Sequence, residues 1–385
     1  MIHLDNAATA SWRPESVGRA FLEALHDASA NPGRSGHGLG LAAARLVEDA
    51  RASLAELFGV TDSAHIAFTK HATESINIVL NGYLRRGDTV LVSSWEHNAV
   101  MRPLRWLECE REVRVEVVPG RLGAPLDVGR LAKRLGDGDV RLVALTAASN
   151  VTGEVLPVAD VGSACRGAGV AFLVDGAQAA GVLDLDVEAA CIDALAVTGH
   201  KGLLGPPGTG ALYLREPEAV EPLVRGGTGS RSDEQTQPAF PPDRFEAGTL
   251  NVPGIAALGA GVAYVKERTP AAIREHVGGL ADRLAGRLRD LPGVDVLRAS
   301  DEGAYLGVVS FNVAGIENGR VARELEARGI LCRHGLQCAP LAHQTLGTAP
   351  AGTVRLSLSA STTGEHIDAT VSAAREIAAT TRGDT

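Results

Sequence analysis

The sequence predicts an α/β fold, in which a large domain with a mostly parallel sheet precedes a smaller α+β domain. Three observations support this prediction. Segments with helix and strand patterns alternate along the first two-thirds of the chain, and its short apolar runs contain few polar residues. The length of 385 residues also exceeds the size of a single small core. Alternation of this kind places helices on both faces of a parallel sheet.

The elements of the sheet region follow from the spacing of their apolar residues. Helical spacing predicts helices over residues 15–30, 39–58, 73–83, 98–110, 127–135 and 157–166. Short aliphatic runs predict strands over residues 65–68, 89–93, 112–118, 141–146, 170–174, 193–197 and 210–214. Asp127 is a typical N-cap residue for its helix.

The amino-acid composition changes over residues 226–251, where Gly, Ser, Gln and Pro dominate. A loop of this length within a compact protein usually has a function. Pro253 then begins a helix rich in Ala and Gly, and a longer helix follows to about residue 291.

The last part of the chain predicts the smaller domain. Its expected strands span residues 307–313, 330–333 and 353–359. We therefore expect a large domain over residues 16–255 and a small domain over residues 256–385, with residues 1–15 packed beside the small domain.

The composition argues against several classes of function. The formal net charge of −9 and the lack of a basic run argue against a nucleic-acid-binding surface. No apolar run reaches membrane-spanning length, and residues 1–6 lack the features of a signal peptide. We therefore expect a cytoplasmic protein that binds neither nucleic acid nor membrane.

The cysteines and histidines predict neither a disulfide framework nor a metal site. The five cysteines include no Cys-x-x-Cys pair, which suits a reducing compartment. His334 and His343 lie near Cys338 in the sequence, but no further residues complete a set of four zinc ligands.

Lys201 is the most informative residue of the chain. Only four of the 37 basic residues are lysines, and Lys201 follows the apolar run 193–197 within a glycine-rich turn. A lysine at the end of a buried strand is desolvated, which lowers the pKa of its amine and suits it to form a Schiff base. The alternative is a surface lysine in a glycine-rich turn.

Asp175 provides a second signal, because it ends the apolar run 170–174. Open α/β sheets place their sites at the carboxyl ends of strands. A carboxylate there could keep the pyridine nitrogen of pyridoxal phosphate protonated. The alternative is a turn formed by Asp175 and Gly176. Asp175 and Lys201 at successive strand ends are more specific together than either is alone.

Four other residues have both a functional and a structural interpretation. Thr73 begins a helix that could hold a phosphate, or it is an ordinary N-cap. His97 follows a strand and could stack on a flat cofactor, or it is structural. Cys338 lies in a turn near Arg and His, which favours a reactive thiol, although most lone cysteines are inert. Arg355 lies within an apolar run and should meet a carboxylate from either the protein or a substrate.

Together these motifs resemble enzymes of the class V aminotransferase fold, in the branch of cysteine desulfurases and selenocysteine lyases. The resemblance runs nearly end to end. It rests on residues 4–9, 31–37, 72–74, 96–98, 149–153, 175–178, 199–201 and 244–249, the Cys338 turn and Arg355. It implies the pyridoxal phosphate-dependent transferase fold of type I, with pyridoxal 5'-phosphate as the cofactor.

The resemblance implies roles for the residues around the cofactor ring. Lys201 would bind the cofactor covalently and act in catalysis. Asp175 would pair with the pyridine nitrogen, and Gln178 would bond the phenolic oxygen. His97 would stack on the ring and take part in catalysis.

The resemblance also implies which residues hold the phosphate. They are Ala72, Thr73, Thr198 and His200. Thr249 would reach the phosphate of the neighbouring subunit, so the resemblance implies a homodimer.

The activity implied by the resemblance is conversion of L-cysteine to L-alanine, with the sulfur retained as a persulfide on Cys338. Substrate contacts are implied for Asn150, Arg333, Arg355 and His37. A sulfur-acceptor protein is a possible partner.

The compact segment after Cys338 resembles group II desulfurases, in which His commonly precedes the cysteine. Here Gln337 takes that position, which removes a possible proton donor beside the thiol. Two alternatives stay open. One is a selenocysteine lyase, or another pyridoxal phosphate-dependent lyase or aminotransferase on the same scaffold. The other is a non-catalytic scaffold protein that keeps the fold.

Overall fold

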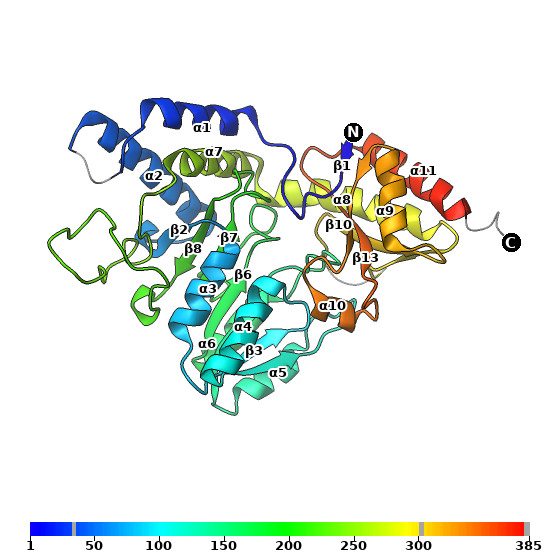
Figure 1. Ribbon diagram of the computed structural model, residues 1–385. Coiled ribbons are helices and arrows are strands. Elements are labelled where there is room, and N and C mark those ends of the chain that lie inside the picture. The colour runs from blue at the N-terminus through cyan, green and yellow to red at the C-terminus, as the bar shows by residue number, and fades with distance from the viewer. Residues whose placement is uncertain (33–35, 300–303, 381–385) are drawn as a thin grey trace.

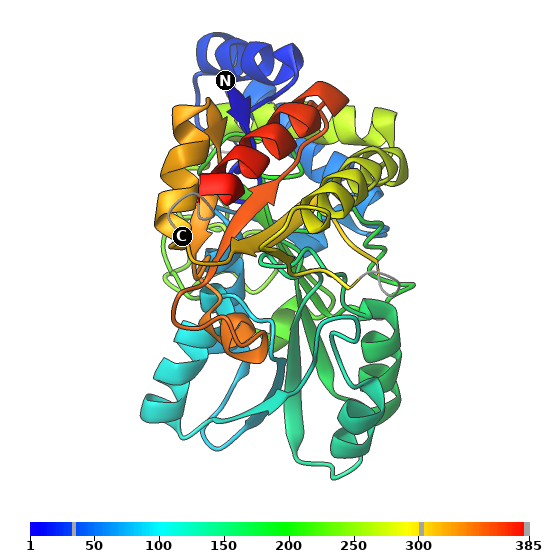
Figure 2. The same ribbon diagram turned by 90° about the vertical axis from the view of Figure 1, so that its right-hand side faces the viewer.

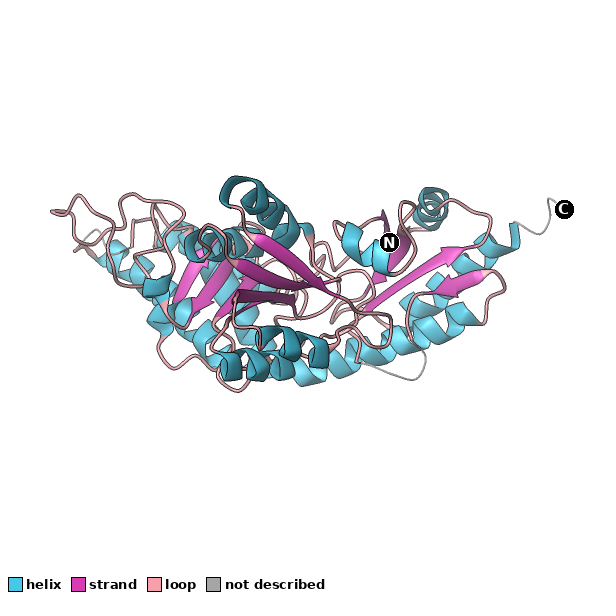
Figure 3. Cartoon of the chain, turned by 90° about the horizontal axis from the view of Figure 1, so that it is seen from below, coloured by secondary structure: helices cyan, strands magenta, loops and turns pink. Residues whose placement is uncertain are grey.

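The computed structural model describes residues 1–32, 36–299 and 304–380. Residues 33–35 of the motif at 31–37 therefore lie outside the described residues. The described chain is elongated, with a seven-stranded sheet toward one end and a four-stranded sheet toward the other (Figure 3). The predicted α/β architecture is confirmed.

The larger sheet has the strand order β2-β8-β7-β6-β5-β3-β4 (Figure 1). Its strands are β2 (Ile66–Thr69), β3 (Thr89–Ser93), β4 (Arg114–Val118), β5 (Val140–Thr146), β6 (Ala171–Asp175), β7 (Ala194–Thr198) and β8 (Gly210–Leu214). Strand β8 pairs antiparallel with both of its neighbours, and the other pairs are parallel. The sheet is therefore mostly parallel, as predicted.

Both faces of this sheet are buried, which explains its nearly continuous apolar runs. Val143 and Leu145 of β5 pack into one hydrophobic cluster, whereas Leu142 and Ala144 pack into another on the opposite face. The first face is covered by α2 (Gly38–Leu57), α5 (Val128–Leu135), α6 (Val158–Ala168) and α7 (Val252–Arg268). The second face is covered by α3 (Ala72–Tyr83) and α4 (Asn98–Arg111).

The smaller sheet is antiparallel and has the order β12-β13-β10-β9. Its strands are β9 (Val294–Val296), β10 (Val308–Val313), β12 (Arg333–Gly335) and β13 (Thr353–Ser357). Three helices pack against one of its faces, namely α8 (Pro270–Arg289), α9 (Asn318–Ala327) and α11 (Gly364–Thr380) (Figure 2).

The two faces of the smaller sheet differ in character, and this difference positions the site. Phe311 and Leu356 on one face pack with the helices into a separate hydrophobic cluster. Ser310 and Arg355 lie on the opposite face and bond backbone carbonyls of the loop that follows β5. The polar face of the smaller sheet therefore meets the carboxyl edge of the larger sheet.

The N-terminal segment crosses between the two sheets. Strand β1 (Ile2–His3) pairs in parallel with β11 (Ile330–Leu331), and Asp5 forms a bridge to Ser357 of β13. Helix α1 (Glu15–Asp27) then packs against α7 beside the larger sheet (Figure 1). The predicted boundary after residue 255 falls within α7, and the division into domains stays a prediction. Among the described residues, no helix combines the length and apolarity that a membrane span requires.

Candidate active site

One cavity of about 70 Å³ at the carboxyl edge of the larger sheet collects most of the predicted cofactor residues. Parallel strands end together at this edge, which is where open α/β sheets form their sites. The predicted residues that line the cavity are Ala72, Thr73, His97, Asn150, Asp175, Gln178, Thr198, His200 and Lys201. Their elements are far apart in the sequence, so the fold alone brings them together.

Lys201 lies in this cavity rather than on an exposed turn, and its side chain is half-buried. Desolvation lowers the pKa of its amine to about 8, against the opposing attraction of Asp175. The preceding turn is tightly packed, because a Cβ on Gly199 would lie 2.1 Å from the Thr209 hydroxyl oxygen. About a tenth of the amine is therefore neutral and nucleophilic at pH 7, a far larger fraction than for an ordinary lysine.

Asp175 ends β6 and is buried. Its Oδ1 accepts a hydrogen bond of 2.9 Å from the amide of Ala177. This bond orients the carboxylate at the floor of the cavity. A buried, oriented carboxylate of this kind can hold a protonated ring nitrogen of a ligand.

His97 is the N-cap residue of α4, and its Nδ1 accepts from the amide of Ala99 at 3.0 Å. The bond leaves Nε2 as the protonated nitrogen of the neutral ring. Desolvation lowers the pKa of His97, and the charge of Asp175 opposes this effect. The imidazole is thus a neutral, oriented plane at the wall of the cavity.

Other residues that line the cavity suit an anion. Ala72 and Thr73 begin α3, whose N-cap residue is His71, so Thr73 is not the N-cap. The hydroxyl oxygen of Thr198 is buried and has no hydrogen-bond partner among the described residues. An unsatisfied buried hydroxyl is costly, and a ligand oxygen would satisfy it. The amide groups at the start of α3 would add to this attraction.

Two buried side chains, those of Asn150 and Arg355, link the loop after β5 to the smaller sheet and the cysteine turn. Asn150 donates from Nδ2 to the carbonyl of Gln337 at 2.6 Å, and its own carbonyl accepts from Arg355 at 2.9 Å. Arg355 is only 2% exposed. Its neighbour across the strands is Arg333, which is exposed. The charges of both arginines lower the pKa of Lys201, so an anionic substrate would meet a positive field here.

Cys338 is exposed at the mouth of the site, in an open hollow of about 590 Å³ that is also lined by Thr73 and His97. Its carbonyl accepts from the amide of Asn98 at 2.8 Å, which ties the cysteine turn to the start of α4. Helix α10 (Pro340–Thr345) begins two residues later, so the turn is compact, as expected.

Two predicted site residues lie away from the cavity within this chain. His37 is exposed, and its Nδ1 accepts from the amide of Gly40 at the start of α2. Thr249 is exposed on the loop before α7. That loop is anchored by Glu246, whose carboxylate forms a buried ion pair with Arg51 at 2.7 Å.

Sequence reasoning missed the buried acid Glu96. Its Oε1 accepts from the Ser93 hydroxyl and from the amide of Thr146, whereas Oε2 is buried without a partner among the described residues. Burial raises the pKa of Glu96 to about 8. Thr146 is the register partner of Asp175, so Glu96 supports the strand beside the central carboxylate. The only sequence signal was its position next to His97.

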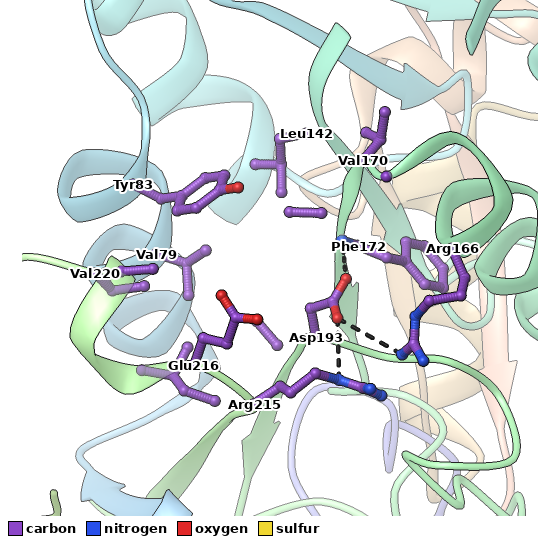
Figure 4. A pocket seen from close by; sticks show the side chains of 15 residues that line it. Val79, Tyr83, Leu142, Arg166, Val170, Phe172, Asp193, Arg215, Glu216 and Val220 are labelled. Carbon is purple, nitrogen blue, oxygen red and sulfur yellow. Dashed lines mark hydrogen bonds and ion pairs between the residues drawn. The ribbon is translucent and has the colours of Figure 1, made fainter. Parts of the chain in front are cut away.

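A larger cavity of about 390 Å³ lies at the other edge of the sheet (Figure 4). It contains an ion-pair cluster in which Asp193 meets Arg166 and Arg215, with Tyr83 on the facing helix. None of the predicted site residues lines it. Within the described ranges, no group of three or more His, Cys, Asp or Glu side chains could hold a metal ion.

Comparison with known proteins gives a consistent result. The aminotransferase class-V family matches residues 2–370. A probable cysteine desulfurase from Methanothermobacter thermautotrophicus is 36% identical, covering 98% of this chain and 94% of the relative. A cysteine desulfurase from Dickeya dadantii is 35% identical, covering 88% and 83%.

Solved structures are similar as well. The apo cysteine desulfurase from Thermococcus onnurineus NA1 has a TM-score of 0.92 and 32% identity, covering 98% of this chain and 94% of that one. The cysteine desulfurase CsdA from Escherichia coli, in an S-sulfonic acid form, has a TM-score of 0.86 and 31% identity, covering 97% and 94%.

Proposed function

Because the chain belongs to the class V aminotransferase family, we propose that it is a pyridoxal phosphate-dependent cysteine desulfurase. It converts L-cysteine to L-alanine and holds the sulfur as a persulfide on Cys338. The observation that carries the proposal is one continuous site, in which Lys201 and Asp175 lie in the cavity while Cys338 and His97 share its mouth.

The residues of the cavity fit the cofactor. Asp175 suits a protonated ring nitrogen, and the orphaned hydroxyl of Thr198 suits a phosphate oxygen. Ala72, Thr73 and His200 would complete the phosphate contacts. When bound, the cofactor supplies an electron sink for negative charge at the substrate Cα. Gln178 would bond the phenolic oxygen, and its side chain is tied by Nε2 to the carbonyl of Ala7.

Lys201 is the group that moves the Cα proton. Its amine has a pKa of about 8, so about a tenth of it is neutral and able to accept a proton at pH 7, and most of it is neutral above pH 8. His97 presents its neutral ring from the wall of the cavity and excludes water from that side.

The arginines orient the substrate. Arg355 holds Asp5 through one nitrogen, whereas its Nε is buried without a partner among the described residues. A substrate carboxylate would satisfy that Nε. Arg333 and Asn150 lie beside it. His37 lies away from this cavity within its own chain, so its implied substrate contact would require the neighbouring subunit.

Cys338 performs the sulfur step. Its thiolate forms an S–S bond with the substrate sulfur as the substrate Cβ–S bond breaks, and the electron pair of that bond stays on carbon. The carbon product is then protonated and leaves as L-alanine. The outer sulfur of the persulfide passes to a thiol of an acceptor, which we infer to be a second protein.

We also infer a homodimer, because Thr249 is exposed and lies outside the cavity of its own chain. Its hydroxyl would serve the phosphate of the neighbouring subunit. A persulfide enzyme needs reduced thiols, and all five cysteines are free, which supports a cytoplasmic location.

The test is a substrate panel with purified enzyme loaded with pyridoxal phosphate. Alanine and sulfide release are measured for L-cysteine, L-selenocysteine and other amino acids, with and without a thiol reductant. L-cysteine should yield alanine, with sulfide release that depends on the reductant. Turnover of selenocysteine alone would favour a selenocysteine lyase, and transamination of other amino acids would overturn the desulfurase assignment.

A further inference from the structure

The turn that carries Cys338 has an unusual backbone. Gln337 and Cys338 have φ values of 41° and 58°, which places two consecutive residues with side chains in the left-handed region. Residues other than glycine rarely adopt this conformation. Such a conformation persists only where the surrounding structure holds it.

The Gln337 side chain is buried and points into the protein, away from solvent. Its Nε2 donates to the carbonyl of Thr353 at 3.0 Å, and its Oε1 accepts from the Thr353 hydroxyl at 3.3 Å. A carbonyl oxygen only accepts hydrogen bonds, so the Thr353 carbonyl fixes which end of the amide is the nitrogen. Gln337 is thus fastened to β13 through both ends of its amide.

His343 completes this network from α10. Its Nε2 lies 2.8 Å from Gln337 Oε1, and its Nδ1 lies 2.7 Å from the Thr348 hydroxyl. Because Oε1 only accepts, Nε2 carries the proton and Nδ1 accepts from Thr348. Burial lowers the pKa of His343 to about 4, so the ring stays neutral and keeps this tautomer.

The backbone of the turn is held from two other sides. The carbonyl of Gln337 accepts from Asn150 at 2.6 Å, and the carbonyl of Cys338 accepts from the amide of Asn98 at 2.8 Å. Hydrogen bonds therefore hold the turn to β13, α10, α4 and the loop after β5. The Gln337 side chain itself joins two of these elements, β13 and α10.

We propose that Gln337 is a positioning residue for sulfur transfer, which acts by holding the Cys338 turn in its left-handed conformation through Thr353 and His343. This inference rests on the proposed desulfurase function. The amide of Gln337 is occupied by the buried network, so it acts through the backbone and donates no proton to the thiol.

The first measurement is amide hydrogen exchange over residues 336–342 in the cofactor-free full chain. Gln337→Met keeps the approximate volume and removes all side-chain hydrogen bonds of Gln337. Exchange over the turn should rise about tenfold, because local opening becomes easier. Thr370→Val is the matched control, since it removes one partly buried hydrogen bond to the His366 carbonyl within α11, away from the turn. Exchange over 336–342 should not change in the control.

The second measurement is single-turnover formation of the Cys338 persulfide in the loaded enzyme. A loosened turn misplaces the sulfur, so Gln337→Met should slow this step about ten- to hundredfold. The KM for L-cysteine and the absorbance change on substrate binding should stay within about twofold, because both report on steps that come before sulfur transfer. Thr353→Val removes only the hydroxyl contact and should slow the step about threefold, which keeps a test available if Gln337→Met folds poorly.

The outcomes separate this inference from the proposed function. Faster exchange with unchanged persulfide formation would make Gln337 purely structural and overturn the inference, as would unchanged exchange in Gln337→Met. If the unsubstituted enzyme forms no persulfide at all, the desulfurase function itself fails.

Discussion

Arg355 and Asp5 form a hydrogen-bonded ion pair at 2.9 Å, while the Nε of Arg355 is buried without a partner among the described residues. Desolvation lowers the pKa of Arg355, and Asp5 opposes this effect. The sequence left open whether Arg355 meets a carboxylate of the protein or of a substrate. The ion pair shows that Arg355 meets a carboxylate of the protein, that of Asp5. The unpaired Nε can still donate a hydrogen bond to a substrate carboxylate. Asp5 therefore holds the guanidinium in place without using all of its donors.

The first prediction concerns this pair. Arg355→Ala should raise the KM for L-cysteine about ten- to a hundredfold, because a charge-assisted hydrogen bond contributes about 1.5–3 kcal/mol. Arg355→Lys should recover only part of the loss, since a lysine cannot reproduce the fork of donors. Steady-state kinetics provide the measurement. Asp5→Asn is the control for the structural part, and it should lower Tm with a smaller change in KM. A lower Tm with an unchanged KM in Arg355→Ala would assign the arginine to structure alone.

The second prediction concerns Lys201. Lys201→Ala should abolish turnover and remove the visible absorbance of covalently held cofactor, with the fold intact by circular dichroism. The reason is that no other lysine lines the cavity. Lys70→Ala is a matched control, because the Lys70 side chain is 76% exposed. Normal turnover by the Lys201 variant would contradict the cofactor assignment.

The third prediction concerns pH. The pKa of Lys201 is lowered from 10.5 to about 8, so the fraction of neutral amine rises as the pH increases through 8. The rate at which cofactor-free protein takes up pyridoxal phosphate should therefore rise about tenfold per pH unit below 8 and level off above it. The reaction of pyridoxal phosphate with Nα-acetyl-lysine, with its rate first divided by the fraction of neutral amine at each pH, corrects for titration of the cofactor. A midpoint near 10.5 would mean that the amine is not desolvated.

The sequence predicted the core of the fold better than its C-terminal part, for a physical reason. The strands β3 and β8 agree with the prediction to the residue, because both are short apolar runs buried on both faces. Strand β9 has only three residues, and the expected strand 330–333 is divided into β11 and β12 around Cys332. Helices α9, α10 and α11 were not located individually, although Ile367, Val371 and Ala374 follow helical spacing.

The sequence also predicted only part of the candidate site. Candidate residues at or just after strand ends, such as Asp175 and Lys201, could be proposed because their positions follow from the pattern of the sheet, and the structure places both in one cavity. Asp5 and Arg355 are separated by 350 positions in the chain, and no local pattern connects them. The network from Gln337 to His343 depends on side-chain direction in a left-handed turn, which the sequence pattern did not predict.

The fourth prediction concerns assembly. The protein should sediment as a dimer at catalytic concentrations, because Thr249 lies outside the cavity of its own chain. Thr249→Ala should weaken retention of pyridoxal phosphate, by about ten- to a hundredfold for one lost hydrogen bond to a charged group. Equilibrium dialysis measures this retention, and Thr61→Ala, at another exposed threonine, should not change it. A fully active monomer would contradict the prediction.

The last prediction concerns Cys338. Cys338→Ala should keep its cofactor and still change its absorbance when L-cysteine binds, yet it should form no persulfide and little alanine. The thiolate is needed only when the substrate Cβ–S bond breaks, so binding and removal of the Cα proton should survive. Mass spectrometry after incubation with L-cysteine should place the added sulfur on Cys338 of the unsubstituted enzyme and on no other cysteine.

Cys332 provides the matched control for this experiment, because it lies six positions earlier in the chain but packs against the hydrophobic cluster of the smaller sheet. Burial raises the pKa of the Cys332 thiol to about 12, with a further contribution from Asp5. The thiol therefore stays protonated at neutral pH and cannot act as a nucleophile, since only the thiolate attacks sulfur. Cys332→Ala should keep its desulfurase activity. If the Cys338 variant desulfurates L-cysteine at the normal rate, sulfur leaves without a protein thiol, and another lyase on this scaffold becomes the better assignment.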